Sequence, residues 1–336
     1  MNKELRHISY CLIALLLFVA CRKESHPNTP EEPEQPEQHY PICMDASSND
    51  MSTSRALVTD DATLQTTDLG VFAYKQLADG TRVRVFDNER VYHKGSVWTY
   101  DNTKYWDRTA HYYFVSYSPH QDTDVEFDNG QLTINNIPNW QAIDDNAKDY
   151  VVANHQGDAE GEYITPNGVQ PVPLDFSHIL SQFEVRVQKN PLLANKYTLK
   201  DIAYSDVPQK EGKTTFVHTV NGGGMRSSAI LDNYTMLDTP DDTEITGNAD
   251  DNPSLKHLVV PFHTNDVTGG IKITLNYAVN GESSNPAEVA TGITELEKGK
   301  RYVLTLTFNS GAEIIPDLKI LGWETEYADE DDKYNW

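Results

Sequence analysis

Residues 302–308 read Tyr-Val-Leu-Thr-Leu-Thr-Phe, a run in which apolar side chains recur at every second position. Side chains two residues apart lie on the same face of a β-strand, so this order predicts a strand with one buried face. Comparable runs occur along the chain at 69–74, 82–86, 96–100, 111–117, 182–188, 255–262 and 271–277. Because no stretch of useful length has helical spacing, we expect a protein that is almost entirely β.

Short turn sequences separate these runs. Asp79-Gly80, Lys94-Gly95, Asn129-Gly130 and Asn280-Gly281 supply the positive φ angles that tight hairpin loops need. Many short strands joined in this way predict an all-β fold of antiparallel Greek-key sandwiches. One sandwich seldom uses so many strands, so we expect two in tandem, joined near residue 165 within the polar stretch 154–170.

The N-terminus has the order of a bacterial signal peptide. Lys3 and Arg6 precede an apolar run over 8–19, which is too short to span a bilayer. Cys21 follows directly and resembles the lipid-bearing cysteine of a lipobox, although Phe18 is bulkier than the leucine usual at its position. We therefore expect a signal peptide over 1–20 and lipidation at Cys21, with an ordinary secretory signal as the alternative.

The segment that follows Cys21 has almost no apolar side chains and a proline every few residues. Such a composition predicts an extended, solvated tether over 21–40. Two sandwich domains, over 41–165 and 166–336, are expected beyond it. Cys11 is lost with the signal and Cys21 is acylated in this interpretation, which leaves Cys43 without an intramolecular disulfide partner.

The formal net charge of −24 excludes a nucleic-acid partner, because phosphates require a basic surface. The acidic stretches 238–251 and 329–332 lack the alternating order of a calcium loop, so we expect solvated loops rather than a metal site. No cofactor-binding motif is present either. The run Gly222-Gly223-Gly224 lacks the lysine of a phosphate loop and predicts a flexible loop.

An enzyme is the main competing class. The histidines are scattered, and no nucleophile-elbow or helical zinc motif occurs. His111 and His257 are expected on the solvent side of their strands. Asp175, Ser177 and His178 lie close in sequence, but the members of a catalytic triad converge from separate elements. We therefore expect no catalytic site.

Three segments resemble one family, the fimbrillins and fimbrillin-like lipoproteins of Bacteroides-type bacteria, which build or decorate type V pili. The segment over 296–306 is similar to the family's Gly-Lys-x-Tyr turn and the strand after it. The segment over 176–185 resembles the one that opens the family's C-terminal domain. The third resemblance comprises 52–56 and 68–74, with Trp98 and the pair Tyr105-Trp106 behind them.

The resemblance implies two transthyretin-like sandwiches without a catalytic site, lipid-anchored at the outer membrane and exposed at the cell surface as part of a fimbria. Its partners would be other fimbrial subunits, joined by strand donation. In stalk-forming relatives a trypsin-like protease cuts after an arginine, and Arg55 followed by Ala56 occupies that position here. The residues after Trp323 form a weak donor strand, which favours an anchor, tip or accessory subunit.

A non-polymerising surface lipoprotein that binds a glycan or a host protein is the alternative function. Exposed aromatic side chains are the usual platform for sugars. The candidates are Tyr92, Trp98, Tyr100, Tyr105 and Trp106.

Overall fold

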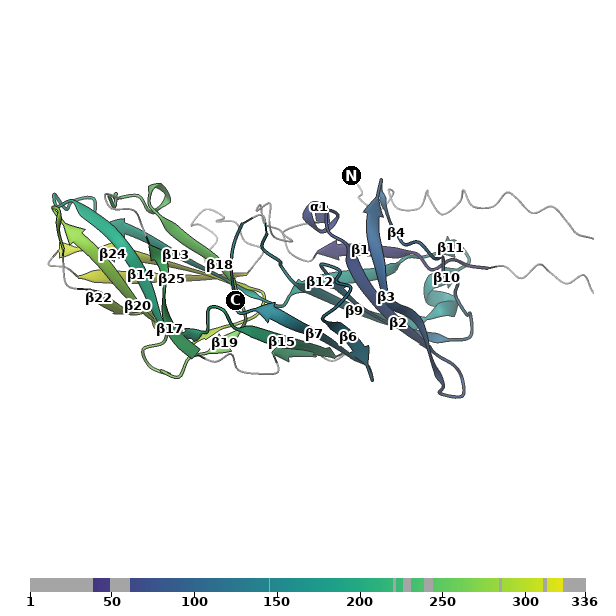
Figure 1. Ribbon diagram of the computed structural model, residues 1–336. Helices are drawn as coiled ribbons and strands as arrows, with labels where there is room; N and C mark the ends of the chain where they lie inside the picture. Colours follow the sequence, from purple (N-terminus) through teal and green to yellow (C-terminus); the bar gives the residue numbers. More distant parts are fainter. Residues whose placement is uncertain are drawn as a thin grey trace, which may run out of the picture.

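The computed structural model describes residues 39–48, 61–144, 146–219, 222–225, 231–238, 244–283, 286–310 and 313–322. Cys21, Arg55 and Ala56 lie outside these ranges. The described chain is almost entirely β, and its two main bodies lie end to end (Figure 1). The all-β sandwich class predicted from the sequence is confirmed.

The first body is a closed barrel of strands around one apolar core. Its strand order is β1 (Met44–Ser48), β12 (Val172–His178), β9 (Val151–Asp158), β5 (His111–Ser118), β2 (Leu69–Gln76), β3 (Arg82–Lys94) and β4 (Val97–Thr99), and β4 pairs back to β1. The short helix α1 (Asp61–Leu64) packs beside β1. Neighbouring strands are antiparallel except β1 and β12, which run parallel. Closure through β1 removes the free edges that an open sheet would present.

The second body is a sandwich of two sheets. One sheet has the order β25 (Ile314–Gly322), β24 (Lys300–Phe308), β13 (Ser181–Lys189), β18 (Ser254–Val259) and β8 (Trp140–Ala142). The other has β17 (Leu231–Asp238), β14 (Tyr197–Pro208), β20 (Lys272–Val279) and β21 (Glu282–Ser283), with β22 (Ala287–Ala290) also paired to β20. Apolar residues of both sheets form one core, in which Phe183, Tyr204 and Leu304 are buried.

A third sheet covers the outside of the barrel and links the two bodies. Its order is β16 (Gly222–Met225), β15 (Lys213–Thr219), β7 (Gln131–Pro138) and β6 (Val125–Asp128). Phe72 and Val115 from the barrel pack with Ile134, Phe216 and Leu258 in a shared core. Smaller elements complete the described chain: β10 (Ile164–Thr165) with β11 (Gly168–Val169), β19 (Phe262–His263) with β23 (Glu295–Leu296), and the short helices η2 (Ala159–Tyr163) and η3 (Ala249–Asp251).

The expected strands and turns correspond closely to observed ones. The run 111–117 lies within β5, 182–188 within β13 and 302–308 within β24. Gly80, Gly95, Gly130 and Gly281 all have positive φ in the hairpin turns. The prediction of a flexible loop at 222–224 is wrong, since these glycines lie in β16 and pair with β15.

Strand pairing crosses the predicted join near residue 165. β12 lies beyond that residue, yet Val172, Leu174 and Phe176 are buried in the barrel core. The family-like segment 176–185 therefore spans two bodies, because Phe183 lies in the sandwich core. β8 pairs with β18, and β15 with β7, so each half of the chain also completes a sheet of the other. The four domain ranges remain a prediction.

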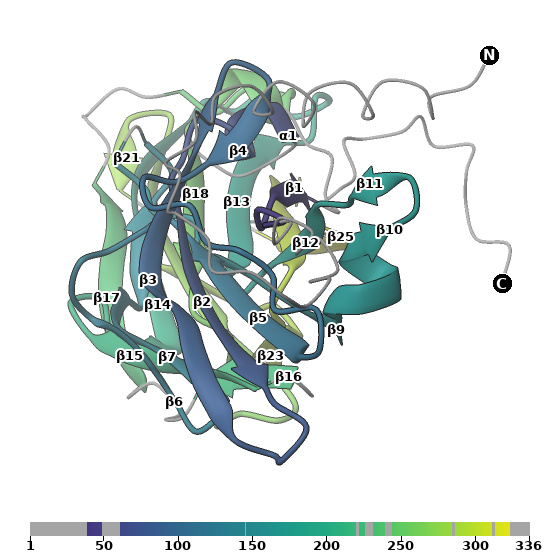
Figure 2. The same cartoon turned by 90° about the vertical axis from the view of Figure 1, so that its right-hand side faces the viewer.

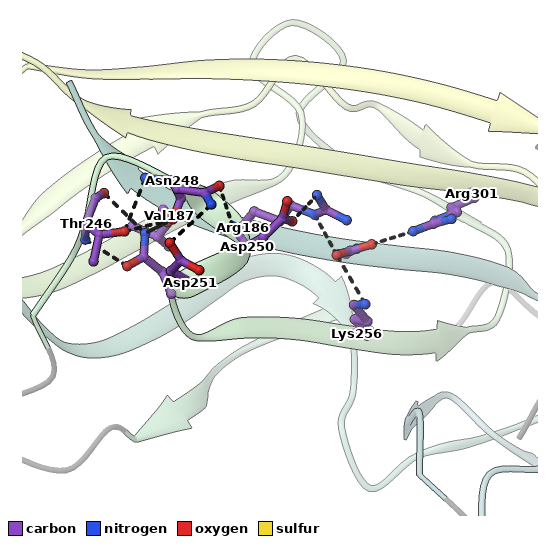
Figure 3. A network of polar contacts seen from close by, with 10 residues as sticks. Arg186, Val187, Thr246, Asn248, Asp250, Asp251, Lys256 and Arg301 are labelled. Atoms are coloured by element: carbon purple, nitrogen blue, oxygen red, sulfur yellow. Dashed lines mark hydrogen bonds and ion pairs between the residues drawn. The ribbon is translucent and has the colours of Figure 1, made fainter. Parts of the chain in front are cut away.

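A buried carboxylate ties three strands of the sandwich together (Figure 3). Glu184 on β13 accepts hydrogen bonds from Arg186 Nε at 2.7 Å and Arg301 Nη2 at 2.9 Å, and Lys256 Nζ lies 3.7 Å away. Burial acts to raise the pKa of Glu184, but the arginine hydrogen bonds, together with the positive charges of Arg186 and Lys256, outweigh it and hold the pKa below its ordinary value. Asn252 anchors the adjoining loop by donating to the Val187 carbonyl at 2.8 Å.

Candidate assembly site

The N-terminal strand of the barrel is the feature of interest for assembly. Residues 40–48 lie in the gap between β12 and β4, with β1 beside β12 (Figure 2). Ile42, Met44 and Ala46 point into the core and are 2%, 5% and 4% exposed. These alternate side chains pack in the same core as Trp106, Leu174 and Phe176. A strand with three alternate apolar side chains therefore fills this gap.

A backbone ladder joins β1 to β12. The register pairs Met44 with Val172 and continues for five residues to Ser48 and Phe176. The Val172 amide also donates to the Cys43 carbonyl at 2.8 Å. On the outer face, the Ser47 hydroxyl donates to Asp175 at 2.8 Å.

The opposite edge of the strand is held by backbone groups and by side chains, and the Trp106 amide donates to the Tyr40 carbonyl at 2.9 Å beside a bridge between Pro41 and Tyr105. β1 pairs with β4 through Met44 and Trp98. The Trp98 indole Nε1–H donates to the Ala46 carbonyl at 3.3 Å, and the Tyr100 hydroxyl donates to the Ile42 carbonyl at 2.8 Å. The Ile42 amide donates to the Lys104 carbonyl at 2.9 Å. Burial raises the pKa of Tyr100 to about 12, so its hydroxyl stays protonated at physiological pH.

The chain leaves β1 toward the expected processing position. The Ser48 amide donates to the Asp61 carboxylate at 2.8 Å, so the described residues on either side of 49–60 are hydrogen-bonded to each other. Arg55 and Ala56 belong to that stretch, outside the described residues. Cys43 lies on the strand side of this stretch as a partly buried thiol in no disulfide, and its Sγ lies 3.9 Å from the Pro41 carbonyl oxygen.

The last described strand, β25, is partly exposed to solvent. β25 pairs along its full length with β24, from Phe308 opposite Ile314 to Lys300 opposite Gly322. Ile315 and Ile320 are nevertheless 44% and 49% exposed, while Leu318 is partly buried. A strand at a sheet edge offers its outer backbone groups to another chain.

The residues considered for enzyme chemistry do not form a site. Strand alternation puts Asp175 and Ser177 on the exposed face of β12, whereas His178 is buried and lies 3.0 Å from Asp149. The expectation that His257 faces solvent is wrong, since it is buried against the Trp140 ring. His111 is partly buried and lies 2.7 Å from Asp158. Within the described ranges, no group of three His, Cys, Asp or Glu side chains could hold a metal ion.

Most of the aromatic residues predicted as a sugar platform are buried or hydrogen-bonded within the protein. Trp98 and Trp106 are buried, and the Tyr92 hydroxyl donates to Asp101 at 3.0 Å. Tyr105 is 52% exposed and packs against His39. Among the described residues, no helix is long and apolar enough to cross a membrane.

Comparison with known proteins identifies the family. The model of the fimbrillin-like family matches residues 54–323. The chain belongs to this family. The fimbrillin-like protein is therefore a structural protein of cell-surface fimbriae, as the resemblance in its sequence suggested. The matched range begins after Ser48, so β1 precedes it although it completes the barrel.

Solved structures share the fold of this fimbrillin-like protein. A fimbrial protein from Bacteroides vulgatus has a TM-score of 0.53 at 16% identity, and the match covers 85% of this chain and 100% of that one. A putative cell adhesion protein from Bacteroides ovatus has a TM-score of 0.52 at 15% identity, over 86% of this chain and 100% of that one. No curated protein matches the sequence.

Proposed function

We propose that this protein is an anchor, tip or accessory subunit of a type V-like fimbria and joins its neighbours by strand donation. The observation that carries the proposal is the separable strand over 40–48. It completes the barrel core, contributes one side of a five-residue ladder, and precedes the range matched by the family. If it leaves, the barrel exposes apolar side chains and unpaired backbone groups that a neighbouring strand can satisfy together.

One cut links this strand to the membrane anchor. Cleavage after Arg55 separates residues 40–48 from the body together with the lipid on Cys21. Until that cut, the lipid holds the protein at the outer membrane. After it, the strand remains in the barrel only through noncovalent contacts, so a donated strand can replace it.

The C-terminus favours an end or accessory position over a repeating stalk unit. β25 has apolar residues at alternate positions, but it is already paired with β24. Beyond Trp323, only Tyr327, Tyr334 and Trp336 could anchor a further strand. A subunit with a complete acceptor barrel and a weak donor segment is suited to an end of the fimbria.

Intact-mass measurement of the protein taken from cells tests the proposal. We expect acylated Cys21 at the mature N-terminus of an anchor or precursor, and a start at Ala56 in the processed subunit. Arg55→Ala should abolish the Ala56 start, whereas the matched change Arg22→Ala should leave it unchanged. An unprocessed, non-acylated protein that does not co-purify with fimbriae contradicts the proposal.

A glycan- or host-binding lipoprotein is the second candidate. Trp98, Tyr100 and Trp106 hold or pack the N-terminal strand, which leaves Tyr105 as the exposed member of the predicted platform. We therefore favour the fimbrial subunit. Glycan-array binding that is lost in Tyr105→Ala would instead support the second function.

A further inference from the structure

The N-terminal strand is bound unequally along its two edges. Toward β12 it forms an ordinary ladder, whose register depends on backbone groups of both strands. Toward β4 its backbone pairings are that of Met44 with Trp98 and a bridge between Pro41 and Tyr105, where the Ile42 amide donates to the Lys104 carbonyl and the Trp106 amide donates to the Tyr40 carbonyl, each at 2.9 Å. Two aromatic side chains supply further hydrogen bonds on that side. The β4 edge therefore differs from a normal strand pair.

The two side-chain donors match the repeat of a β-strand. Ile42 and Ala46 are four residues apart, so their carbonyl groups point to the same edge of the strand. Tyr100 donates to the first carbonyl and Trp98 to the second. Tyr100 also accepts a hydrogen bond from the Lys104 amide at 3.2 Å. Because the Ile42 amide donates to the Lys104 carbonyl, Ile42, Lys104 and Tyr100 form a closed hydrogen-bonded ring.

The surrounding core fixes both donors in place. Trp98 is buried, and its ring packs edge-on with His93 at 5.2 Å between centroids. Tyr100 packs edge-on with Phe86 at 5.1 Å. Both side chains are thus oriented by contacts with β3, outside the strand that they bind.

We propose that Trp98 and Tyr100 are positioning residues that hold the backbone of whichever strand fills this gap. The occupant is the chain's own segment 40–48 first, and then the strand donated by a neighbouring subunit; this second step rests on the proposed function. The two donors bind carbonyl groups, which every residue carries, so they select an extended conformation. The core positions of Ile42, Met44 and Ala46 select apolar side chains at alternate residues.

Hydrogen exchange in the full chain tests the role of the donors in the resident strand. Tyr100→Phe should raise the exchange rate of the Ile42 amide by about fivefold, since it removes one hydrogen bond to the strand. Labelling of the Cys43 thiol, located by peptide mapping, should accelerate in parallel. Trp98→Phe keeps an aromatic ring but removes the indole N–H, and it should also raise the exchange rate and the labelling rate.

Controls separate positioning from a general loss of stability. The Tyr92 hydroxyl donates to Asp101 and not to the N-terminal strand. Tyr92→Phe should therefore change neither the exchange rate of the Ile42 amide nor the labelling rate of Cys43. Tyr100→Phe should lower the free energy of global unfolding, measured with denaturant, by less than it lowers the free energy of local opening at 40–48, measured by hydrogen exchange. Unchanged exchange at Ile42, or an equal rise at amides throughout the barrel, overturns the proposal.

Strand replacement tests the second step. The full chain nicked after Arg55 is mixed with a labelled peptide of residues 39–48, and peptide uptake is followed. Faster uptake by Tyr100→Phe than by wild type, with weaker final binding, supports the positioning role. Equal uptake and equal binding by both proteins overturn it. No uptake by nicked wild type contradicts strand donation itself, while the exchange result above still decides the role of Tyr100.

Discussion

The indole Nε1–H of Trp140 donates to the carbonyl oxygen of Pro208 at 2.7 Å, across 68 residues of sequence. Trp140 belongs to β8, which the first half of the chain contributes to the sandwich of the second half. β15 makes the reverse contribution by pairing with β7. The two bodies are therefore joined through shared sheets as well as through the connecting chain.

Shared sheets predict that the two bodies unfold together. Trp140→Ala should lower the free energy of unfolding by about 3–5 kcal/mol, because it empties a large core volume and removes a buried hydrogen bond. Denaturant unfolding followed by hydrogen exchange should show the loss in barrel and sandwich strands alike. Leu192→Ala, at an exposed loop position, should have little effect. Two transitions, with only one shifted, would contradict this coupling.

Removal of the buried charge on Glu184 should also be costly. Glu184→Gln leaves the two arginines without their carboxylate, and we expect a loss of about 3 kcal/mol in unfolding free energy. Chemical denaturation gives the value directly. Glu288→Gln, an exposed change on β22, is the matched control and should stay within about 0.5 kcal/mol. Equal stability of the two variants would argue against a structural role for the network.

Two buried tyrosines should respond differently to loss of their hydroxyls. The Tyr163 hydroxyl is buried and has no hydrogen-bond partner among the described residues, whereas the Tyr112 hydroxyl accepts from the Asp107 amide at 2.8 Å. Tyr163→Phe should be neutral or stabilising, since it removes an unsatisfied polar group. Tyr112→Phe should cost about 1 kcal/mol. Thermal and denaturant unfolding compare the pair, and a larger loss for Tyr163→Phe would refute the expectation.

His257 should make stability depend on pH. Burial, with a smaller effect of Lys210, lowers the pKa of His257 to about 4 from an ordinary value of 6.5. The unfolded chain binds the proton more readily, so stability should fall by up to about 3 kcal/mol as pH drops from 6.5 toward 4. Burial lowers the pKa of His218 in the same way. His257→Gln should flatten part of this fall in denaturation measured at successive pH values; an unchanged slope would exclude His257 as a cause.

The strands were predictable where a local pattern encodes them. The alternation in 111–117 and 302–308 identifies a buried face without knowledge of the neighbouring strands. His257 was misplaced because both faces of its strand carry apolar residues, Leu255 on one and Leu258 on the other. The deciding neighbour, Trp140, comes from the other half of the chain. Gly222 to Gly224 have no side-chain pattern at all, and their strand exists because β15 offers them an edge.

The sequence by itself determined the all-β class, the hairpin turns and the resemblance to the fimbrillins, since each depends on residues close together along the chain. Only the tertiary structure decided which strands the segment 40–48 joins and which side chains hold it. Ser47 meets Asp175 across 128 residues of sequence, and the Tyr100 hydroxyl reaches the Ile42 carbonyl across 58. Such pairings depend on how the whole barrel closes, and no local pattern of residues specifies them.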